Sequence, residues 1–156
     1  MKNLLVIYLC VGSEKKKIKI DKMVKQLLKV EEFQKTYKST HNLHPVANLG
    51  EKINNLRFDL MKEENEEYIA AAQQGDLVEV ADALGDMLYI LCGTIISHGM
   101  QYKIEEVFDE IHDSNMSKLD ENGMPIFRED GKVLKGSDYF KPNLKDILFR
   151  TKSREL

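Results

Sequence analysis

Two acidic stretches decide how this chain is interpreted: Lys62-Glu63-Glu64-Asn65-Glu66-Glu67, and then Glu79-Val80-Ala81-Asp82 followed by Asp86. Both lie in segments with helical periodicity, and residues three apart share one face of a helix. Glu64 therefore projects with Glu67, and Glu79 projects with Asp82. The sequence predicts two helices that each present a row of carboxylates on one side.

The segment Gln73-Gln74-Gly75-Asp76 separates the two acidic stretches. Gly75 is typical of a helix end. Asp76 is typical of a helix start, and Glu79 stands three residues later, as in a capping box. The sequence therefore predicts a short break at which the second helix folds back along the first.

Folding back at this break brings the two acidic faces together. We expect Glu67 to face Glu79 and Glu64 to face Asp82, with Asp86 one turn deeper as an outer group. Four carboxylates at one place repel one another and lose hydration, so they are tolerable when a divalent cation lies among them. Because all the donors are oxygens, Mg²⁺ or Mn²⁺ suits the cluster better than zinc.

The competing interpretation of an acidic helix face is simple solvation, which the first stretch alone favours. The second stretch changes the balance because Asp82 and Asp86 lie in a helix that is otherwise almost wholly apolar. An aspartate there is costly unless it is paired or bound to metal, and no Lys or Arg is near it in sequence. We therefore favour a metal site. Glu79 has a second role in the cap, and the two roles are compatible.

Composition is that of an ordinary soluble protein, with 156 residues, 42% hydrophobic residues, 31% charged residues and a net charge of −3. This charge is too small to indicate binding to nucleic acid or membranes. The two cysteines, Cys10 and Cys92, form no disulfide framework, and Cys92 is typical of a small core residue. We expect a cytoplasmic protein.

The apolar run Leu4–Val11 superficially resembles a signal peptide, but it is too short to span a bilayer and has no evident cleavage site. A buried strand and an added helix are alternatives. We expect residues 1–20 to be an N-terminal extension, either a tail or the product of an upstream start codon, and residues 21–156 to form the domain.

Apolar periodicity predicts helices over residues 21–38, 50–73, 77–98 and 104–118, with a loop at 39–49 that contains His41 and His44. Asp130-Gly131 between short apolar runs predicts a hairpin. One short helix is expected beyond Pro142. The third helix is so apolar that we expect burial on most sides, partly by a second subunit. The fold class is therefore all-α: an antiparallel helical bundle with a short C-terminal hairpin, its core completed by dimerisation.

Candidate anion-binding residues follow the acidic helices. Asn115 and Lys118 lie three residues apart on the fourth helix and are candidates for binding phosphate. Lys132 and Lys135 flank the predicted hairpin and are candidates for closing over an anionic ligand. Arg57 lies two turns before Glu64 and is a candidate partner for an acid.

These motifs together resemble the all-α nucleoside triphosphate pyrophosphohydrolases: the MazG-like proteins, the dimeric dUTPases and the phosphoribosyl-ATP pyrophosphohydrolases. Their signature, ExxE, a gap and then ExxD, matches Glu64–Glu67 and Glu79–Asp82. The resemblance continues through the segments DALGDMLY (82–89), SNMSK (114–118) and DGKVLKG (130–136), and covers roughly residues 53–145. It implies a helical core that forms a homodimer or homotetramer, with the active site near the subunit interface.

The resemblance implies Mg²⁺-dependent hydrolysis of a nucleoside triphosphate to the monophosphate and pyrophosphate, with dUTP or another pyrimidine or modified deoxynucleotide as the best candidate. Glu63 and Glu64 are then the catalytic candidates, with Glu63 positioning or deprotonating water. The metal ligands are expected among Glu64, Glu67, Glu79, Asp82 and Asp86, and the substrate-binding residues are Asn115, Lys118, Lys132 and Lys135.

Three alternatives remain open. Phosphoribosyl-ATP hydrolysis in histidine biosynthesis uses the same chemistry. A non-catalytic helical module with an acidic docking face belongs to another class. A two-metal carboxylate oxidase is disfavoured because it requires Glu-x-x-His pairs, and neither Glu64 nor Glu79 has a His three residues on.

Overall fold

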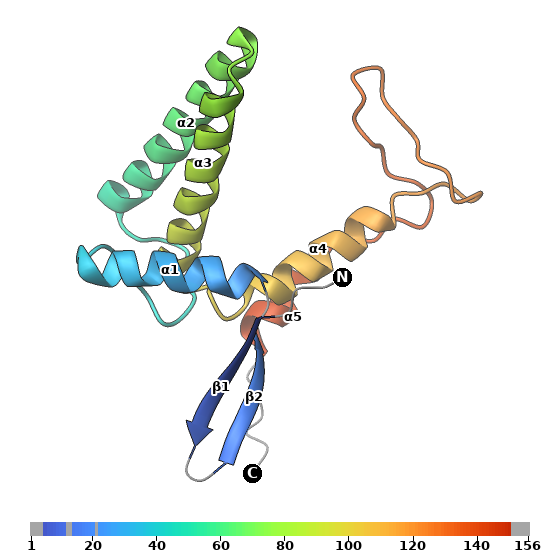
Figure 1. Ribbon diagram of the computed structural model, residues 1–156. Coiled ribbons are helices and arrows are strands. Elements are labelled where there is room, and N and C mark those ends of the chain that lie inside the picture. Colours follow the sequence, from blue (N-terminus) through green and yellow to red (C-terminus); the bar gives the residue numbers. More distant parts are fainter. Residues whose placement is uncertain (1–4, 12–13, 21, 151–156) are drawn as a thin grey trace. The chain divides into compact units, whose positions relative to one another are not determined.

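The computed structural model of the chain describes residues 5–11, 14–20 and 22–150. The chain divides between Gln101 and Tyr102 into two compact units. The first unit contains strands β1 (Leu5–Val11) and β2 (Glu14–Ile20) and helices α1 (Lys22–Thr36), α2 (Glu51–Gln74) and α3 (Leu77–Ser97), and the second contains helices α4 (Ile104–Met116) and α5 (Leu144–Phe149) (Figure 1). The predicted helices are confirmed, each within two residues at either end, and the fold is helical as expected.

The N-terminal apolar run forms a strand. β1 pairs with β2 in an antiparallel ladder in which Leu5 lies opposite Ile20 and Val11 lies opposite Glu14. Of the structures considered for this run, a strand is therefore the one its backbone adopts. That residues 1–20 form an extension separate from the domain stays a prediction.

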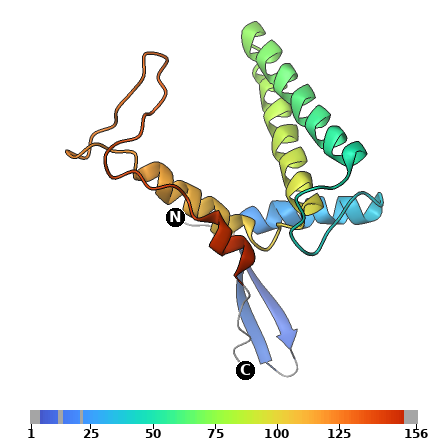
Figure 2. The ribbon, with the colours of Figure 1, turned by 180° about the vertical axis from the view of Figure 1, so that it is seen from behind.

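Helices α2 and α3 form an antiparallel pair (Figures 1 and 2). Gly75 ends α2 with φ = 72°, and the backbone N–H of Asp76 donates to the Ala71 carbonyl at 3.1 Å. This left-handed glycine with its backward hydrogen bond closes the helix. The Asp76 carboxylate then accepts from the backbone N–H groups of Val78 and Glu79 at 3.0 and 3.2 Å and caps α3. Both predicted boundary residues are confirmed.

The core of the first unit lies where α1 packs on the C-terminal half of α3. Leu27 and Val30 of α1 and Cys92, Ile95 and Ile96 of α3 are buried, and Cys92 is a free thiol. The buried Gln34 amide donates to the Gly93 carbonyl at 3.0 Å and to Ser97 Oγ at 3.2 Å. These bonds fix α1 against α3, because an unpaired buried amide is costly.

The predicted loop at residues 39–49 is held against the end of α3. The backbone N–H of Val46 donates to the His98 carbonyl at 3.0 Å, and the Asn42 amide donates to the Ser97 carbonyl at 2.7 Å. His41 contacts Glu31 at 3.0 Å. Both predicted loop histidines thus lie in a structural connection.

Gly99 lies just after α3, where the loop at residues 39–49 packs closely against the backbone, and it has φ = 69°. A Cβ added there would lie 2.0 Å from the His44 carbonyl oxygen. We expect Gly99→Ala to destabilise the protein by at least about 2 kcal/mol, because left-handed strain and backbone overlap combine. Thermal unfolding measures the change. Gly123→Ala is the matched control, since Gly123 has φ = 74° but no atom within 4 Å of its added Cβ. Equal losses in the two variants would show that the overlap at Gly99 relaxes without cost.

Within one chain α3 is buried on only part of its surface. Cys92, Gly93 and Ile95–Ser97 near its C-terminal end are buried, but Leu84, Leu88 and Leu91 are 42–49% exposed. That a second subunit buries part of the rest stays a prediction. By length and composition alone, α3 is also long and apolar enough to cross a membrane. Core helices of soluble proteins have the same properties, so this is weak evidence for a membrane span.

In the second unit, α4 contacts α5, and the buried Ser114 hydroxyl donates to the Phe140 carbonyl at 2.8 Å. The predicted hairpin is present as a turn with single bridges in place of regular strands. Gly131 has φ = 83°, the N–H of Arg128 donates to the Lys132 carbonyl at 2.8 Å, and Phe127 bridges Val133.

Candidate functional site

The acidic residues line the antiparallel pair formed by α2 and α3. Glu64 is partly buried, whereas Glu63 and Glu67 on α2 and Asp82 and Asp86 on α3 are exposed. Partial burial and then the neighbouring carboxylates Glu67, Asp86, Glu63 and Asp82, in that order, raise the pKa of Glu64. Carboxylates from both acidic stretches therefore lie near enough to Glu64 to raise its pKa.

The register of the pair differs from the expected one. Asp86 acts on the pKa of Glu64 more strongly than Asp82 does. Further along the pair, Arg57 Nη1 of α2 lies 3.1 Å from the position of a Cβ on Gly93 of α3. Residues that lie the same number of positions before and after Gly75 in the sequence thus face each other, because the chain reverses at Gly75. The expectation that Glu64 faces Asp82, with Asp86 as an outer group, is wrong by about one helical turn.

The donor chemistry of this cluster suits Mg²⁺, since every group is a carboxylate. Among the described residues, no Lys, Arg or His forms an ion pair with any of these acids, in contrast to Glu66, whose carboxylate lies 3.7 Å from Lys62 Nζ. The side chains do not converge as they stand: within the described ranges, no three His, Cys, Asp or Glu residues form a group that could hold an ion. A cation would require rotation of these mostly exposed side chains.

The Glu79 carboxylate makes no hydrogen bond in the helix cap. A full capping box would have its carboxylate accept from the Asp76 N–H, but that N–H donates to Ala71. In the part of the chain that the structure describes, the Glu79 side chain makes no hydrogen bond or ion pair. Its carboxylate is available to a ligand, although it does not appear among the groups that raise the pKa of Glu64.

The raised pKa of Glu64 predicts a pH-dependent stability. When the pKa of a carboxyl is higher in the folded than in the unfolded state, the folded protein becomes less stable as the pH rises through the folded-state pKa. We expect Glu64→Gln to raise the midpoint of thermal unfolding by a few degrees at pH 7, and the gain to vanish below the unfolded pKa of about 4.3. Unfolding scans from pH 3.5 to 8 measure it. A gain that is the same at every pH would mean that charge repulsion is not its cause.

Arg57 does not pair with an acid in the described residues. Its Nη1 lies 3.1 Å from the position of a Cβ on Gly93 of α3, a position that Val30 and Gln34 of α1 also approach, and its Nε is buried without a hydrogen-bond partner. Burial lowers the pKa of Arg57. Because positions seven apart share a helix face, Arg57 and Glu64 show that the acids lie on the side of the pair that faces α1.

The second unit gathers some of the predicted phosphate-binding residues. Lys118 Nζ donates to Asn115 Oδ1 at 2.6 Å, and the backbone N–H of Gly136, next to Lys135, donates to the Lys118 carbonyl at 3.2 Å. Lys135 Nζ also lies 4.2 Å from the centre of the Tyr139 ring. Lys132 lies in the turn at Asp130-Gly131. Asn115, Lys118 and Lys135 thus lie close together at one end of α4.

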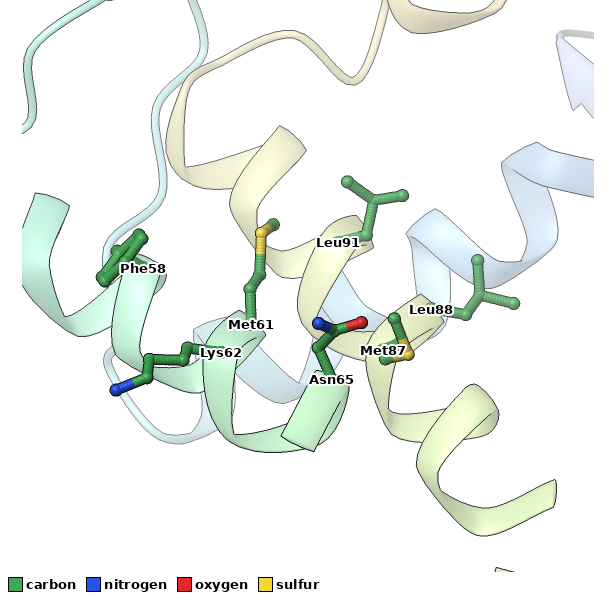
Figure 3. A pocket seen from close by; sticks show the side chains of 7 residues that line it. All are labelled: Phe58, Met61, Lys62, Asn65, Met87, Leu88 and Leu91. Atoms are coloured by element: carbon green, nitrogen blue, oxygen red, sulfur yellow. The ribbon is translucent and has the colours of Figure 1, made fainter. Parts of the chain in front are cut away.

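An open pocket of about 660 Å³ lies between α2 and α3, lined by Phe58, Met61, Lys62, Asn65, Met87, Leu88 and Leu91 (Figure 3). In Figure 3 the Lys62 side chain extends away from α3, so the lining is mainly apolar. Sequence reasoning did not single out these residues as a surface.

A sequence profile described as phosphoribosyl-ATP pyrophosphohydrolase matches residues 30–115. This is more than half of the 156 residues. The chain belongs to this family. Membership places it in the MazG-like superfamily of nucleoside triphosphate pyrophosphohydrolases, as the acidic motifs indicated, and supports hydrolase activity on phosphoric anhydrides.

The family match contains all the acids and Asn115 but ends before Lys118, Lys132 and Lys135. A second similarity is to the uncharacterised protein L479 of Acanthamoeba polyphaga mimivirus, at 27% identity over 121 residues. The aligned region covers 76% of this chain but only 44% of that relative, so the chain spans less than half of the relative's length.

Proposed function

We propose that this protein hydrolyses a nucleoside triphosphate to the monophosphate and pyrophosphate, with dUTP or another pyrimidine or modified deoxynucleotide as substrate. The observation that carries the proposal is that carboxylates of both α2 and α3 raise the pKa of Glu64, while no ion pair to a cation is present at these acids among the described residues. Carboxylate oxygens are the ligands that a hard cation such as Mg²⁺ prefers.

Glu64, Glu67, Asp82 and Asp86, with Glu79 nearby, are the proposed ligands of Mg²⁺ or Mn²⁺. When bound, the cation offsets charge on the phosphates and makes water more acidic. Glu63 adjoins Glu64 and is the proposed group that positions the attacking water and accepts its proton. Water adds across the anhydride bond between the α and β phosphates, and pyrophosphate leaves.

Asn115 and Lys118 are the proposed ligands of the triphosphate, from the same subunit or from its partner. Their contact at 2.6 Å orients the Asn115 amide and the Lys118 ammonium together. Lys135 and Lys132 are proposed to hold the far end of the phosphate chain. Cations and amide donors are the groups that phosphate oxygens bind.

A pyrophosphate-release screen tests this function. Ordinary and modified nucleoside triphosphates are supplied with Mg²⁺, with phosphoribosyl-ATP in the same panel. We expect release from at least one pyrimidine deoxynucleotide. Release from none of the substrates, together with weak binding of Mg²⁺ by calorimetry, would favour a non-catalytic acidic docking module.

Phosphoribosyl-ATP hydrolysis is the second candidate, favoured by the description of the matching family profile. The chemistry at the acids is the same, so only the substrate panel separates the two. Faster release from phosphoribosyl-ATP than from every deoxynucleotide would establish this candidate.

We further propose that a second copy of the chain covers the apolar pocket shown in Figure 3, giving a homodimer or a dimer of dimers. Phe58 is 67% exposed and Leu91 is 44% exposed, and apolar surface of this kind is typical of subunit contacts. We expect Leu91→Glu to convert the assembly to monomers, measured by light scattering after gel filtration. Ile69→Glu, an exposed α2 residue outside the pocket, is the control. A wild-type monomer would contradict the proposal.

A further inference from the structure

The first unit contains a cationic side chain that is partly buried and has no partner. Arg57 of α2 is of intermediate exposure, and its Nε is buried. Within the described residues, the Arg57 guanidinium makes no hydrogen bond and no ion pair. A charge that is taken out of water without a partner destabilises the folded state. Packing of the helices therefore gives no reason for a charged residue at this position.

The Arg57 guanidinium lies where α1, α2 and α3 meet. Gly93 of α3 leaves room for it, because a Cβ on Gly93 would lie 3.1 Å from Arg57 Nη1 and 3.5 Å from Gln34 Nε2 of α1. Gln34 is 2% exposed, and its Oε1 has no hydrogen-bond partner. Arg57 Nε is a donor and Gln34 Oε1 is an acceptor, so a contact between the two side chains would satisfy both buried atoms.

The terminal nitrogens of Arg57 are open to a ligand. Nη1 and Nη2 also lack hydrogen-bond partners, but they are not fully buried, in contrast to Nε. Their N–H groups lie in one plane and match two oxygens of a phosphate group, which is why arginine is favoured where phosphates are bound. The accessible edge of this guanidinium is therefore suited to phosphate.

Arg57 lies on the face of α2 that carries Glu64. Seven residues separate the two in sequence, which is about two turns, or about 10.5 Å along the helix axis. On α3, Asp86 and Gly93 are also seven residues apart. Both helices therefore place the guanidinium at the same distance from the acids, and a polyphosphate chain that begins at the acids can extend along this face to Arg57.

We propose that Arg57 binds the phosphates that are released as pyrophosphate. The proposal rests on the proposed nucleotide hydrolysis and adds to it a cation from the same unit as the acids. The guanidinium offsets the negative charge of these phosphates in the substrate and in the transition state. This role also accounts for an arginine that is left without a partner inside the protein.

Arg57→Met provides the test, because it removes the charge and keeps an unbranched side chain that fills the same space. Lys52→Met is the matched control: Lys52 is an exposed cation of the same helix, so the net charge changes by the same amount. Binding of inorganic pyrophosphate is measured by calorimetry with Mg²⁺ present, and binding of Mg²⁺ alone is measured separately. Thermal unfolding is recorded on the same preparations.

We expect Arg57→Met to weaken pyrophosphate binding by at least about tenfold, because a charge-assisted contact is lost. Lys52→Met should bind pyrophosphate within about twofold of the wild type, because exposed charges contribute little. Mg²⁺ binding should stay within about twofold of the wild type in both variants, because neither variant alters a carboxylate. Arg57→Met should unfold at the same temperature as the wild type or higher, since an uncompensated charge is gone.

Three results would overturn the proposal: a wild type that does not bind pyrophosphate, undiminished pyrophosphate binding by Arg57→Met, or a loss of Mg²⁺ binding and thermal stability along with it. Failure of the proposed hydrolysis gives a different pattern. If pyrophosphate binding depends on Arg57 but no nucleotide is hydrolysed, the phosphate site stands and the hydrolysis does not.

Discussion

Replacing Glu64 by Gln should lower Mg²⁺-dependent pyrophosphate release by at least about 100-fold while the fold is retained. Glu64 is the acid on which the other four act, and losing a ligand of the catalytic cation removes several kcal/mol of transition-state stabilisation. Steady-state kinetics and a thermal unfolding scan on the same preparation separate the two effects. The variant should unfold at a higher temperature than the wild type at pH 7, since a repelled charge is gone.

Glu66→Gln is the matched control for this substitution. Glu66 lies two residues further along α2, is exposed, and pairs with Lys62, so it points away from the cluster. We expect its turnover to stay within about twofold of the wild type, since exposed helix pairs of this kind contribute little. Equal activity of Glu64→Gln and Glu66→Gln would remove Glu64 from the site.

Substitution of the α3 aspartates is the second change for which we expect a large loss of turnover. Asp82→Asn and Asp86→Asn should each abolish most turnover, by at least about 100-fold, because both are proposed ligands of the cation and both raise the pKa of Glu64 from the other helix. The two differ in how they act on Glu64. Asp86→Asn should lower the pKa of Glu64 more than Asp82→Asn does, because Asp86 has the stronger effect in the wild type.

Carboxyl-detected NMR titration of Glu64 in both variants measures this difference. Asp59→Asn, an exposed α2 position outside the cluster, is the control and should leave the pKa of Glu64 unchanged. A larger decrease in Asp82→Asn would restore the register in which Glu64 faces Asp82. Full activity in either α3 variant would exclude that residue from the ligand set.

Much of the fold could be predicted because its signals are local. Helical periodicity predicted the ends of four helices to within two residues. Gly75 and Asp76 indicated where the chain reverses, because glycine is favoured in the left-handed conformation at a helix end and aspartate is favoured as a helix N-cap. The strands of residues 5–20 had no comparable signal. Their apolar run is short, and short runs do not distinguish a strand from other buried structure.

The acids were identifiable from the sequence, but their pairing was not. Carboxylates at helical spacing within an apolar helix, as at Asp82 and Asp86, indicate a ligand wherever the helix packs. Which of them faces Glu64 depends on the residue at which the chain reverses. If the reversal moves by one residue, every pair of residues that face each other across α2 and α3 changes.

The sequence by itself determined the helices, their boundary residues and the acidic side chains, since each follows from neighbours within one or two helical turns. Only the tertiary structure decided the register of α2 against α3, the exposure of the N-terminal half of α3 and the apolar pocket between α2 and α3. These depend on how residues far apart in the chain pack together. Packing is set by the shapes of both surfaces at once, and no single segment encodes it.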